Sequence, residues 1–201
     1  MPPRAEPSGV TGLVLAAGGS SRLGRPKQLL PYRGATLLDA VLETARSCRF
    51  DQLVVALGGS AREVRAAVDL RGADVVVNDA FGAGCSSSIA ASMSAVRNDA
   101  GVLVLLLGDQ PGVGVEAVRA LLAGRGDAQL AVCRYDDGRG HPFAFAHSMF
   151  GDLRALHGDK GVWRLLEQRG ADVVEVPVAG RVPRDVDTWE DYEAALAAAA
   201  P

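Results

Sequence analysis

Cysteine is scarce in this sequence: Cys48, Cys85 and Cys133 are the three that occur, and they lie far apart. Their number is odd and no two form a C-x-x-C pair, which excludes a disulfide framework and a zinc site of paired cysteines. His147 and His157 lack the spacing of metal ligands as well. Reduced cysteines of this kind fit a cytoplasmic protein, and we expect that location.

Long apolar runs are also lacking, since no stretch approaches the roughly 18 residues that a membrane-spanning helix needs. Residues 1–11 are polar and proline-rich without an apolar segment, so we expect disorder there rather than a signal peptide. The net charge of -3 provides no overall basic field that would favour nucleic acid. No repeat or linker divides the chain, and we expect one domain over residues 12–200.

A glycine-rich stretch, Leu13 to Gln28, is the most informative part of the sequence. It begins with the apolar run of a buried parallel strand and then breaks into glycines and serines with three cations, Arg22, Arg25 and Lys27. Backbone N–H groups of such a loop converge on phosphate oxygens, and cationic side chains balance their charge. The stretch therefore predicts a phosphate-binding loop; a structural turn with solvated cations is the alternative.

Three better-known motifs do not fit. Gly19 and Gly24 have the spacing of a Walker loop, but Arg25 and Pro26 follow where Lys and Ser or Thr belong. Ser20 stands where the dinucleotide fingerprint G-x-G-x-x-G has its second glycine. The sequence contains no G-x-S-x-G, which argues against a hydrolase of that type.

Apolar strands and helical segments alternate along the chain. This alternation predicts an α/β fold, a three-layer sandwich around a mostly parallel, Rossmann-like sheet. A turn is expected over 135–140, a short strand from 140, and a polar turn over 157–161 between two helical stretches. The strands are predicted from residue 13 and over 52–57, 74–77, 101–107, 129–133 and 173–178; the helices over 36–46, 61–68, from the 82–88 loop to about 96, 114–123 and 188–199.

Carboxylates follow several strand ends, where ligands bind in open α/β sheets. Asp109 comes after a strand without charged residues, a suitable place for Mg²⁺, which prefers oxygen ligands. Asp185 and Asp187 alternate before a helix, so in extended backbone both would face the same way. Capping is the alternative role for each. We expect Mg²⁺ at Asp109 and Asp187, with the choice between Asp185 and Asp187 open.

Other polar clusters have a structural and a functional interpretation. Residues 86–88 are serines that open a helix, where they would cap its N-terminus or bind a base or sugar. Gly82 and Gly84 would let a flat ring lie against the backbone. A lone histidine such as His141 is more often structural than catalytic.

The loop pattern L-A-A-G-x-S-x-R-L-G-x-x-K-x-L resembles the signature of nucleotidyltransferases that load a nucleotide onto molybdopterin or sugar phosphates. The later motifs G-D-Q-P, G-H-P, G-D-K-G and D-V-D-T-W-E-D-Y occur in the expected order. Over about residues 12–195 the chain resembles the molybdenum cofactor cytidylyltransferases of the MobA-like NTP transferase family. That resemblance implies a fold of the nucleotide-diphospho-sugar transferase type. Gln110 followed by Pro111 departs from many relatives, and Leu23 replaces the commoner Met.

The resemblance implies Mg²⁺-dependent transfer of CMP from CTP, or of a nucleotide from another NTP, to a molybdopterin-type acceptor phosphate with release of pyrophosphate. A molybdoenzyme or its chaperone is a further implied partner, whereas nucleic acid and membrane are not. The implied roles are catalysis for Lys27, Arg22 and Asp109, metal binding for Asp109 and Asp187, and acceptor binding for His141, Asp159 and Lys160. The implied nucleotide-binding residues are Leu15, Ala16, Ala17, Gly18, Gly19, Ser20, Arg22, Lys27, Asp79, Gly84, Ser86 and Asp109.

The base is expected to be cytosine. Leu15 to Gly18 reads L-A-A-G, the form typical of cytidylyl transfer, whereas relatives that transfer guanylyl groups typically read L-A-G-G. The methyl group of Ala17 takes room that a purine would need more than a pyrimidine does. Packing of Ala17 against the next helix is the alternative explanation.

Two other functions stay open. Some members of this family are described as reductases that act on pigments with a nicotinamide cofactor, which the missing G-x-G-x-x-G does not favour. A non-catalytic module that delivers or senses a molybdopterin cofactor is the second alternative. The presence of both Lys27 and Asp109 argues against a degenerate site of that kind.

Overall fold

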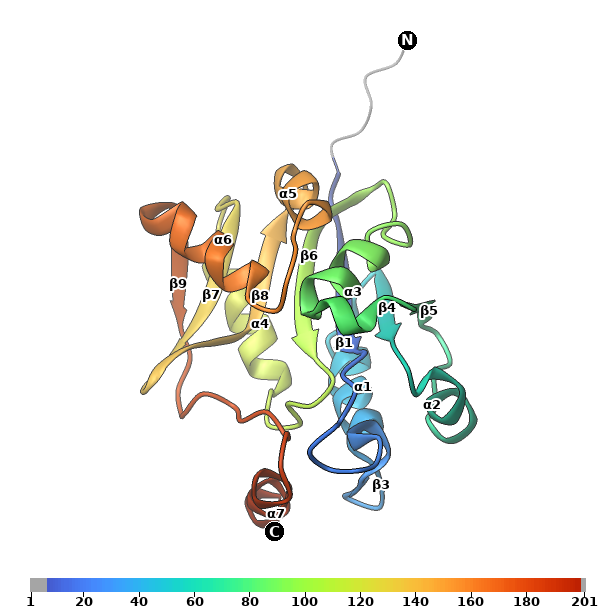
Figure 1. Cartoon of the computed structure of the whole chain (residues 1–201). Coiled ribbons are helices and arrows are strands. Elements are labelled where there is room, and N and C mark those ends of the chain that lie inside the picture. Colours follow the sequence, from blue (N-terminus) through green and yellow to red (C-terminus); the bar gives the residue numbers. More distant parts are fainter. Residues whose placement is uncertain (1–6, 200–201) are drawn as a thin grey trace.

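The computed structural model describes residues 7–199 and has a central seven-stranded sheet (Figure 1). Its strands are β1 (Gly9–Ala16), β4 (Gln52–Leu57), β5 (Asp74–Val77), β6 (Ala100–Leu107), β7 (Leu130–Tyr135), β8 (Gly138–Ala146) and β9 (Val173–Pro177). Their order is β5-β4-β1-β6-β8-β7-β9; β8 runs antiparallel to β6 and β7, and the other neighbours are parallel. A mostly parallel sheet is therefore confirmed.

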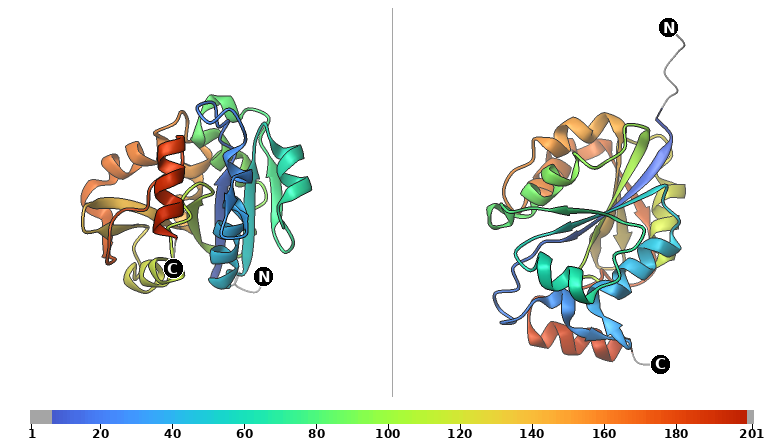
Figure 2. Two further views of the ribbon diagram at one scale, coloured as in Figure 1. Left: turned by 90° about the horizontal axis from the view of Figure 1, so that it is seen from below. Right: turned by 90° about the vertical axis from the view of Figure 1, so that its right-hand side faces the viewer.

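Helices cover both faces of the sheet (Figure 2). One layer contains α1 (Leu37–Ser47), α2 (Ala61–Ala67) and α4 (Val115–Gly124); the other contains α3 (Cys85–Ser92), α5 (Phe150–Arg154) and α6 (Gly161–Arg169). Each layer encloses an apolar core against the sheet, with Val14 and Val104 in one and Leu13 and Phe143 in the other. This arrangement confirms the predicted three-layer sandwich.

A third, smaller core lies beyond the carboxyl ends of the strands. Here α7 (Trp189–Ala198) packs with the short pair β2 (Pro31–Tyr32) and β3 (Ala35–Thr36) around Leu30 and Val186 (Figure 1). Four 3-10 turns complete the fold: η1 (Lys27–Leu29), η2 (Phe81–Ala83), η3 (His147–Met149) and η4 (Gly170–Asp172).

Capping boxes begin two of these helices. The Oγ1 atom of Thr36 accepts a hydrogen bond from the Asp39 backbone N at 3.1 Å, and Thr188 and Asp191 repeat this arrangement at 3.2 Å. Each cap satisfies a helix-terminal N–H group and stabilises its helix by about 1 kcal/mol. They fix the starts of α1 and α7, the two helices nearest the glycine-rich loop and the last carboxylates.

Some boundaries differ from the prediction. Disorder is predicted over residues 1–11, but β1 already includes residues 9–11; residues 1–6 and residue 200 lie outside the described residues. The helix predicted to reach about residue 96 ends at Ser92, because Ser92 and Ser94 hydroxyls bond to backbone carbonyls there and compete with the helical pattern. The pair β2 and β3 was missed because its strands have only two residues each.

The turn predicted over 135–140 is present but shorter, because Asp136 and Asp137 alone form the tip of a β-hairpin. Strand β7 continues to Tyr135, and β8 starts at Gly138 and runs for nine residues rather than forming a short strand from 140. Arg134 pairs with Arg139 and Tyr135 with Gly138 across it. Pairing within the sheet overrides the turn preference of these glycines.

Among residues 7–199, no helix combines the length and apolar character that a bilayer crossing requires.

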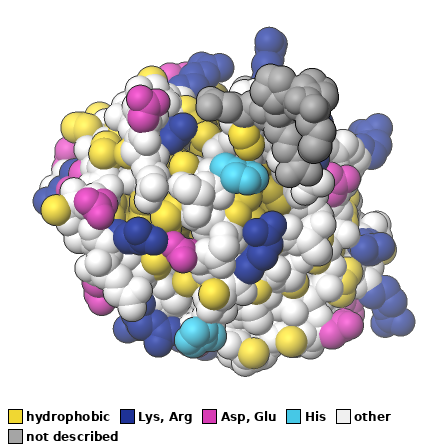
Figure 3. Space-filling view, turned by 90° about the horizontal axis from the view of Figure 1, so that it is seen from above, with side chains coloured by type: hydrophobic (Ala, Val, Ile, Leu, Met, Phe, Trp, Pro, Cys, Tyr) yellow, Lys and Arg dark blue, Asp and Glu magenta, His cyan; other side chains and the backbone are white. Residues whose placement is uncertain are grey.

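At the end of the sheet opposite the strand carboxyl ends, the visible surface carries scattered side chains of both charges (Figure 3).

Candidate functional site

Hydrogen bonds join two segments at the carboxyl ends of the strands, the loop after β6 and the segment before α7. The Val186 backbone N donates to the Asp109 carbonyl oxygen at 3.0 Å. The Gln110 Nε2 atom donates to Asp185 Oδ1 at 2.7 Å and to the Pro183 carbonyl oxygen at 3.1 Å. The end of β6 and the segment before α7 thus form one unit, although more than seventy residues separate them.

Lys27 lies between the two carboxylates that this unit presents. Its Nζ atom donates to Asp187 Oδ1 at 2.7 Å and also to Asp109 Oδ2, and its side chain is only 10% exposed. Burial disfavours the ammonium, but the charges and hydrogen bonds of Asp109 and Asp187 outweigh burial and raise the pKa of Lys27. Arg22 adds a longer ion pair to Asp187, at 3.6 Å.

Two neighbours hold Lys27 and its loop. Ser20, at a positive φ of 50°, accepts a hydrogen bond from the Lys27 backbone N at 2.9 Å. Gln28 is buried, and its Nε2 atom donates to the carbonyl oxygens of Ala16 at 2.7 Å and Gly18 at 3.2 Å. Sequence reasoning missed Gln28, because a lone glutamine carries no charge or periodicity signal; its place next to Lys27 was the one available hint.

A cavity of about 470 Å³ opens beside this loop. Asp159, expected to face the acceptor, lines this cavity instead, where its Oδ1 accepts from the Cys85 backbone N at 3.2 Å. Of the predicted nucleotide-binding residues, Leu15, Ala17, Gly18, Gly19, Gly84 and Asp109 line it; so does Ser88, one of the three serines considered for a base or sugar, and Phe81 and Cys85 line it without having been predicted.

Three glycines shape this cavity. Gly84 has a φ of 102°, and a Cβ there would lie 2.6 Å from Asp159 Oδ1, so a larger residue does not fit. A Cβ on Gly59 would lie 2.6 Å from Phe81 Cζ, and one on Gly58 would lie 2.4 Å from the Ala17 carbonyl oxygen. The Phe81 ring is therefore seated against the glycines that end β4, as one wall of the cavity.

Three residues expected at the ligands line neither of the two large cavities. Ser86 is buried, and its hydroxyl faces the Cα of Gly161 rather than the cavity, because the first turn of α3 rotates it inward. Ala16, expected to contact the nucleotide through its backbone, has its side chain in the core on the α1 face, which leaves that prediction open. Asp79 and Lys160 are exposed and outside both large cavities, since each lies in a loop turned to solvent.

A residue beside Asp79 takes part instead. Asn78 is buried, and its Nδ2 atom donates to the hydroxyls of Ser87 at 2.8 Å and Ser88 at 3.0 Å. It ties the end of β5 to α3 and so supports the wall that carries Gly84. The turn-favouring Asn-Asp pair after a strand was a signal, but the sequence did not indicate which of the two points inward.

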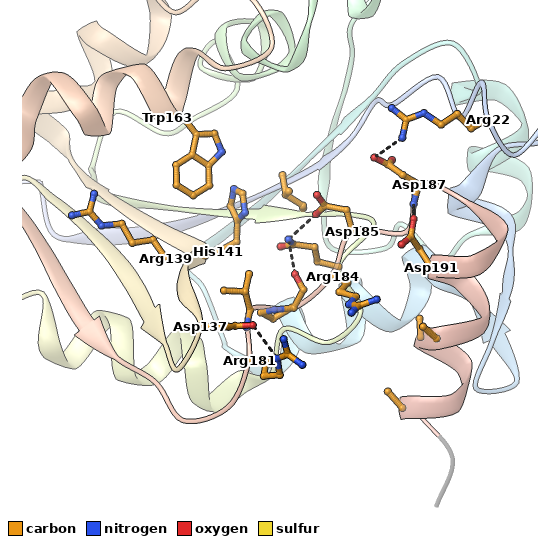
Figure 4. A pocket seen from close by; sticks show the side chains of 18 residues that line it. Arg22, Asp137, Arg139, His141, Trp163, Arg181, Arg184, Asp185, Asp187 and Asp191 are labelled. Atoms are coloured by element: carbon orange, nitrogen blue, oxygen red, sulfur yellow. Dashed lines mark hydrogen bonds and ion pairs between the residues drawn. The ribbon is translucent and has the colours of Figure 1, made fainter.

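A second cavity, of about 880 Å³, adjoins the first (Figure 4). Leu107, His141, Trp163, Asp185 and Asp187 line both. The larger cavity is further lined by four arginines, of which three have acidic partners: Arg22 paired with Asp187, Arg139 paired with Glu175, Arg181 paired with Asp137, and Arg184.

His141 presents a flat, uncharged ring to both cavities. It stacks on Phe143 with ring centroids 4.1 Å apart, and burial lowers its pKa to about 3. Protonation would place a charge in a poorly solvated position, so the ring stays neutral near pH 7. His141 can therefore support a ring or donate a hydrogen bond, but it cannot supply a positive charge to an anionic ligand.

The carboxylates suit a divalent cation. Among the described residues no group of three or more His, Cys, Asp or Glu side chains has the geometry of a complete metal site. Mg²⁺ and similar ions, however, commonly take one or two carboxylates plus substrate phosphates. Partial burial and the charge of Asp109 raise the pKa of Asp185 to about 6, a sign of crowded negative charge at this edge. Asp109 and Asp187 already share one cation, Lys27, so their oxygens fit this role.

The sheet, the glycine-rich loop and this group of Lys27 with two carboxylates together define a nucleotide-binding protein with a nucleotidyltransferase fold. Comparison with known proteins gives the family: residues 12–173 match the MobA-like NTP transferase domain, and the chain belongs to that family. The resemblance deduced from the loop motifs is thereby confirmed.

Three relatives illustrate the range of this family. The chain is 35% identical to nicotine blue oxidoreductase from Paenarthrobacter nicotinovorans, covering 90% of this chain and 93% of the relative. It is 32% identical to purine catabolism protein PucB from Bacillus subtilis, with the same coverage. It is 48% identical to Rv0371c from Mycobacterium tuberculosis, solved in complex with manganese, with a TM-score of 0.85 over 94% of this chain and 99% of that chain.

Proposed function

We propose that the protein transfers CMP from CTP to the phosphate of a molybdopterin-type acceptor and releases pyrophosphate, with Mg²⁺ as the metal. The observation that carries this proposal is the group of Lys27, Asp109 and Asp187 at the junction of two cavities. Phosphoryl transfer needs positive charge that neutralises the charge developing on the phosphate oxygens, and this group would place it at the carboxyl ends of the strands. The manganese complex of the relative Rv0371c supports a divalent metal.

The reaction needs no nucleophile from the protein. An oxygen of the acceptor phosphate attacks the α-phosphorus of CTP, and the bond from that phosphorus to the β-phosphate oxygen breaks. Asp109 and Asp187 would hold the metal, which supplies positive charge to the phosphate oxygens. Lys27 and Arg22 would bind the departing pyrophosphate, and the backbone of the glycine-rich loop would orient the α-phosphate.

The two adjoining cavities support an in-line arrangement. The smaller one, with the glycine-rich loop, would hold CTP, and the larger one would hold the acceptor. Asp187 lines both, so the reacting phosphates would meet beside it. Trp163 and the neutral His141 ring offer flat surfaces, and Arg139 and Arg181 offer cations, a combination suited to a planar anionic acceptor.

A pyrimidine base is part of the proposal. The Ala17 methyl group and the Phe81 ring both narrow the smaller cavity, and Gly58 and Gly59 are needed to seat that ring. A larger purine would have to displace Phe81 or Ala17. A molybdoenzyme or its chaperone as recipient of the product, and a cytoplasmic location, belong to the same proposal. The free thiols of Cys48, Cys85 and Cys133 support a reducing compartment.

A second candidate, reduction of a pigment with a nicotinamide cofactor, is supported by one observation. The relative with 35% identity over most of both chains is named nicotine blue oxidoreductase. Hydride transfer has no need for a lysine between two carboxylates at a phosphate-binding loop, which is why we place it second.

Pyrophosphate release separates these possibilities. The protein is incubated with Mg²⁺, a molybdopterin acceptor and each of the four NTPs, while calorimetry compares binding of CTP and NADPH. Acceptor-dependent pyrophosphate release that is fastest with CTP supports the proposal. Binding of NADPH without binding of CTP favours the reductase, and CTP binding without pyrophosphate release favours a non-catalytic module.

A further inference from the structure

Lys27 occupies the position between Asp109 and Asp187 that a divalent metal would take. Its ammonium donates to one oxygen of each carboxylate. Both carboxylates line the 470 Å³ cavity, whereas Lys27 is not among the lining residues. In this arrangement the carboxylates face the space proposed for the nucleotide, whereas the ammonium of Lys27 does not line it.

Two contacts place Lys27 here. Its backbone N bonds to Ser20, and its Cε lies 3.4 Å from where a Gly18 Cβ would be, so the stem runs beside the glycine-rich loop without crowding it. The side chain is 10% exposed. A charge this poorly solvated needs a partner, and Asp109 and Asp187 are the partners it has in the described structure.

We infer that Lys27 is a resident cation that competes with the divalent metal for Asp109 and Asp187 while no nucleotide is bound, and that the nucleotide phosphates release it. A divalent ion beside the ammonium would be strongly repelled, so the metal binds weakly to the free protein. An NTP brings enough negative charge for both cations. Lys27 then moves onto the phosphates, and the metal takes the carboxylates. Metal and nucleotide therefore strengthen each other's binding.

Lys27 thus acts on the metal as a positioning residue, in addition to its proposed contact with pyrophosphate. This inference rests on the proposed function in one respect, that Asp109 and Asp187 are the metal ligands. A competing lysine would keep the free protein from holding a metal without its substrate.

The test measures Mn²⁺ affinity without any nucleotide, by electron paramagnetic resonance of free Mn²⁺. Lys27→Met removes the ammonium and should bind Mn²⁺ about tenfold tighter than wild type, a coupling of ordinary size. Lys27→Arg retains the charge and should bind as weakly as wild type. Arg62→Met, which removes one positive charge from an exposed position on α2, is the matched control and should match wild type. If Lys27→Met fails to fold, Lys27→Gln replaces it.

The outcomes separate this inference from the proposed function. Equal or weaker Mn²⁺ binding by Lys27→Met overturns the competition while leaving the metal site in place. Binding by neither protein, at any accessible Mn²⁺ concentration, overturns the metal site and the competition together. Tighter binding by Lys27→Met that is lost again in the double variant with Asp109→Asn supports both.

Discussion

The two halves of the sheet build their ligand cavities from different materials. In the half formed by β5, β4, β1 and β6, the smaller cavity includes Gly18, Gly19 and Gly84 from loops that follow strand ends, and none of the described arginines lines it. In the half with β8, β7 and β9, the larger cavity is lined by arginine side chains, among them Arg139 and Arg181. Backbone groups are suited to binding phosphates, which every NTP has. Side chains can be substituted one at a time, so a cavity built from them can change its ligand.

This difference separates the general part of the chemistry from the specific part. A backbone site changes little when one residue is substituted, so relatives can keep NTP binding while they vary the other partner. The four predictions below test this division of labour, from the largest expected effect to the smallest.

Asp109→Asn should have the largest effect. It retains a hydrogen-bond acceptor but removes the charge that would hold the metal, so turnover should fall by about a hundredfold, as for loss of one strong electrostatic group. A Mg²⁺ titration of turnover measures it, with Asp127→Asn at an exposed position as the control. Full activity across the titration would show that Asp109 has no role in metal binding and serves only in the turn that follows β6.

His141→Phe should make stability less dependent on pH. Burial lowers the pKa of His141 to about 3 in the folded protein, from 6.5 for an ordinary histidine. The unfolded chain therefore takes up a proton at a higher pH than the folded protein does. As a result, the free energy of unfolding is highest above pH 6.5 and decreases as the pH falls towards 3. Between pH 6.5 and 5 this loss is about 2 kcal/mol, or a Tm lower by about 4–8 °C.

Phe at this position retains the stacking on Phe143 and carries no titratable group. Its Tm should therefore fall less over the same pH range, which thermal unfolding measures directly. Parallel Tm curves for the two proteins would show that His141 is solvated well enough to take up a proton.

Arg139→Ala should weaken the acceptor site and spare the nucleotide site. Loss of one charge-assisted contact should raise the KM for the acceptor by about tenfold. The KM for CTP should stay within about twofold, since Arg139 lines the larger cavity and not the smaller one. Steady-state kinetics with each substrate varied in turn measures both constants. A rise in the KM for CTP of the same size would mean that the cavities do not act separately.

Ala17→Gly and Phe81→Ala should have the smallest effects. Each enlarges the smaller cavity, so each should narrow the preference for CTP over GTP by about three- to tenfold, the usual worth of a small apolar group. Competition between CTP and GTP at equal concentration, followed by pyrophosphate release, measures the ratio. An unchanged ratio in both variants would assign base selection to the backbone alone.

The same contrast between the two halves explains what the sequence could predict. The longer strands up to β6, the capping boxes and the glycine-rich loop follow from local patterns, and the structure has them. The turn between β7 and β8 was predicted too, but the start of β8 was not, because Gly138 and Gly140 favour turns and are extended by pairing within the sheet.

The candidate site shows a similar limit. Periodicity places Asp109 and Asp187 at strand or helix ends, but the bond from Lys27 to both depends on contacts across more than eighty residues. Ser86 was misplaced because a run of three serines does not show which one the helix turns inward. Gln28 and Asn78 were missed because their roles consist of hydrogen bonds to backbone and hydroxyl groups.

The central claim, nucleotidyl transfer, is tested most directly by following the α-phosphate of CTP. The protein is incubated with Mg²⁺, a molybdopterin acceptor and CTP labelled at the α-phosphorus, and the products are separated. Our account predicts that label moves to the acceptor in equal amount to the pyrophosphate released, and that both form about a hundredfold more slowly with Asp109→Asn. Label that remains in CTP, while the acceptor is unchanged and wild-type protein is folded, would contradict it.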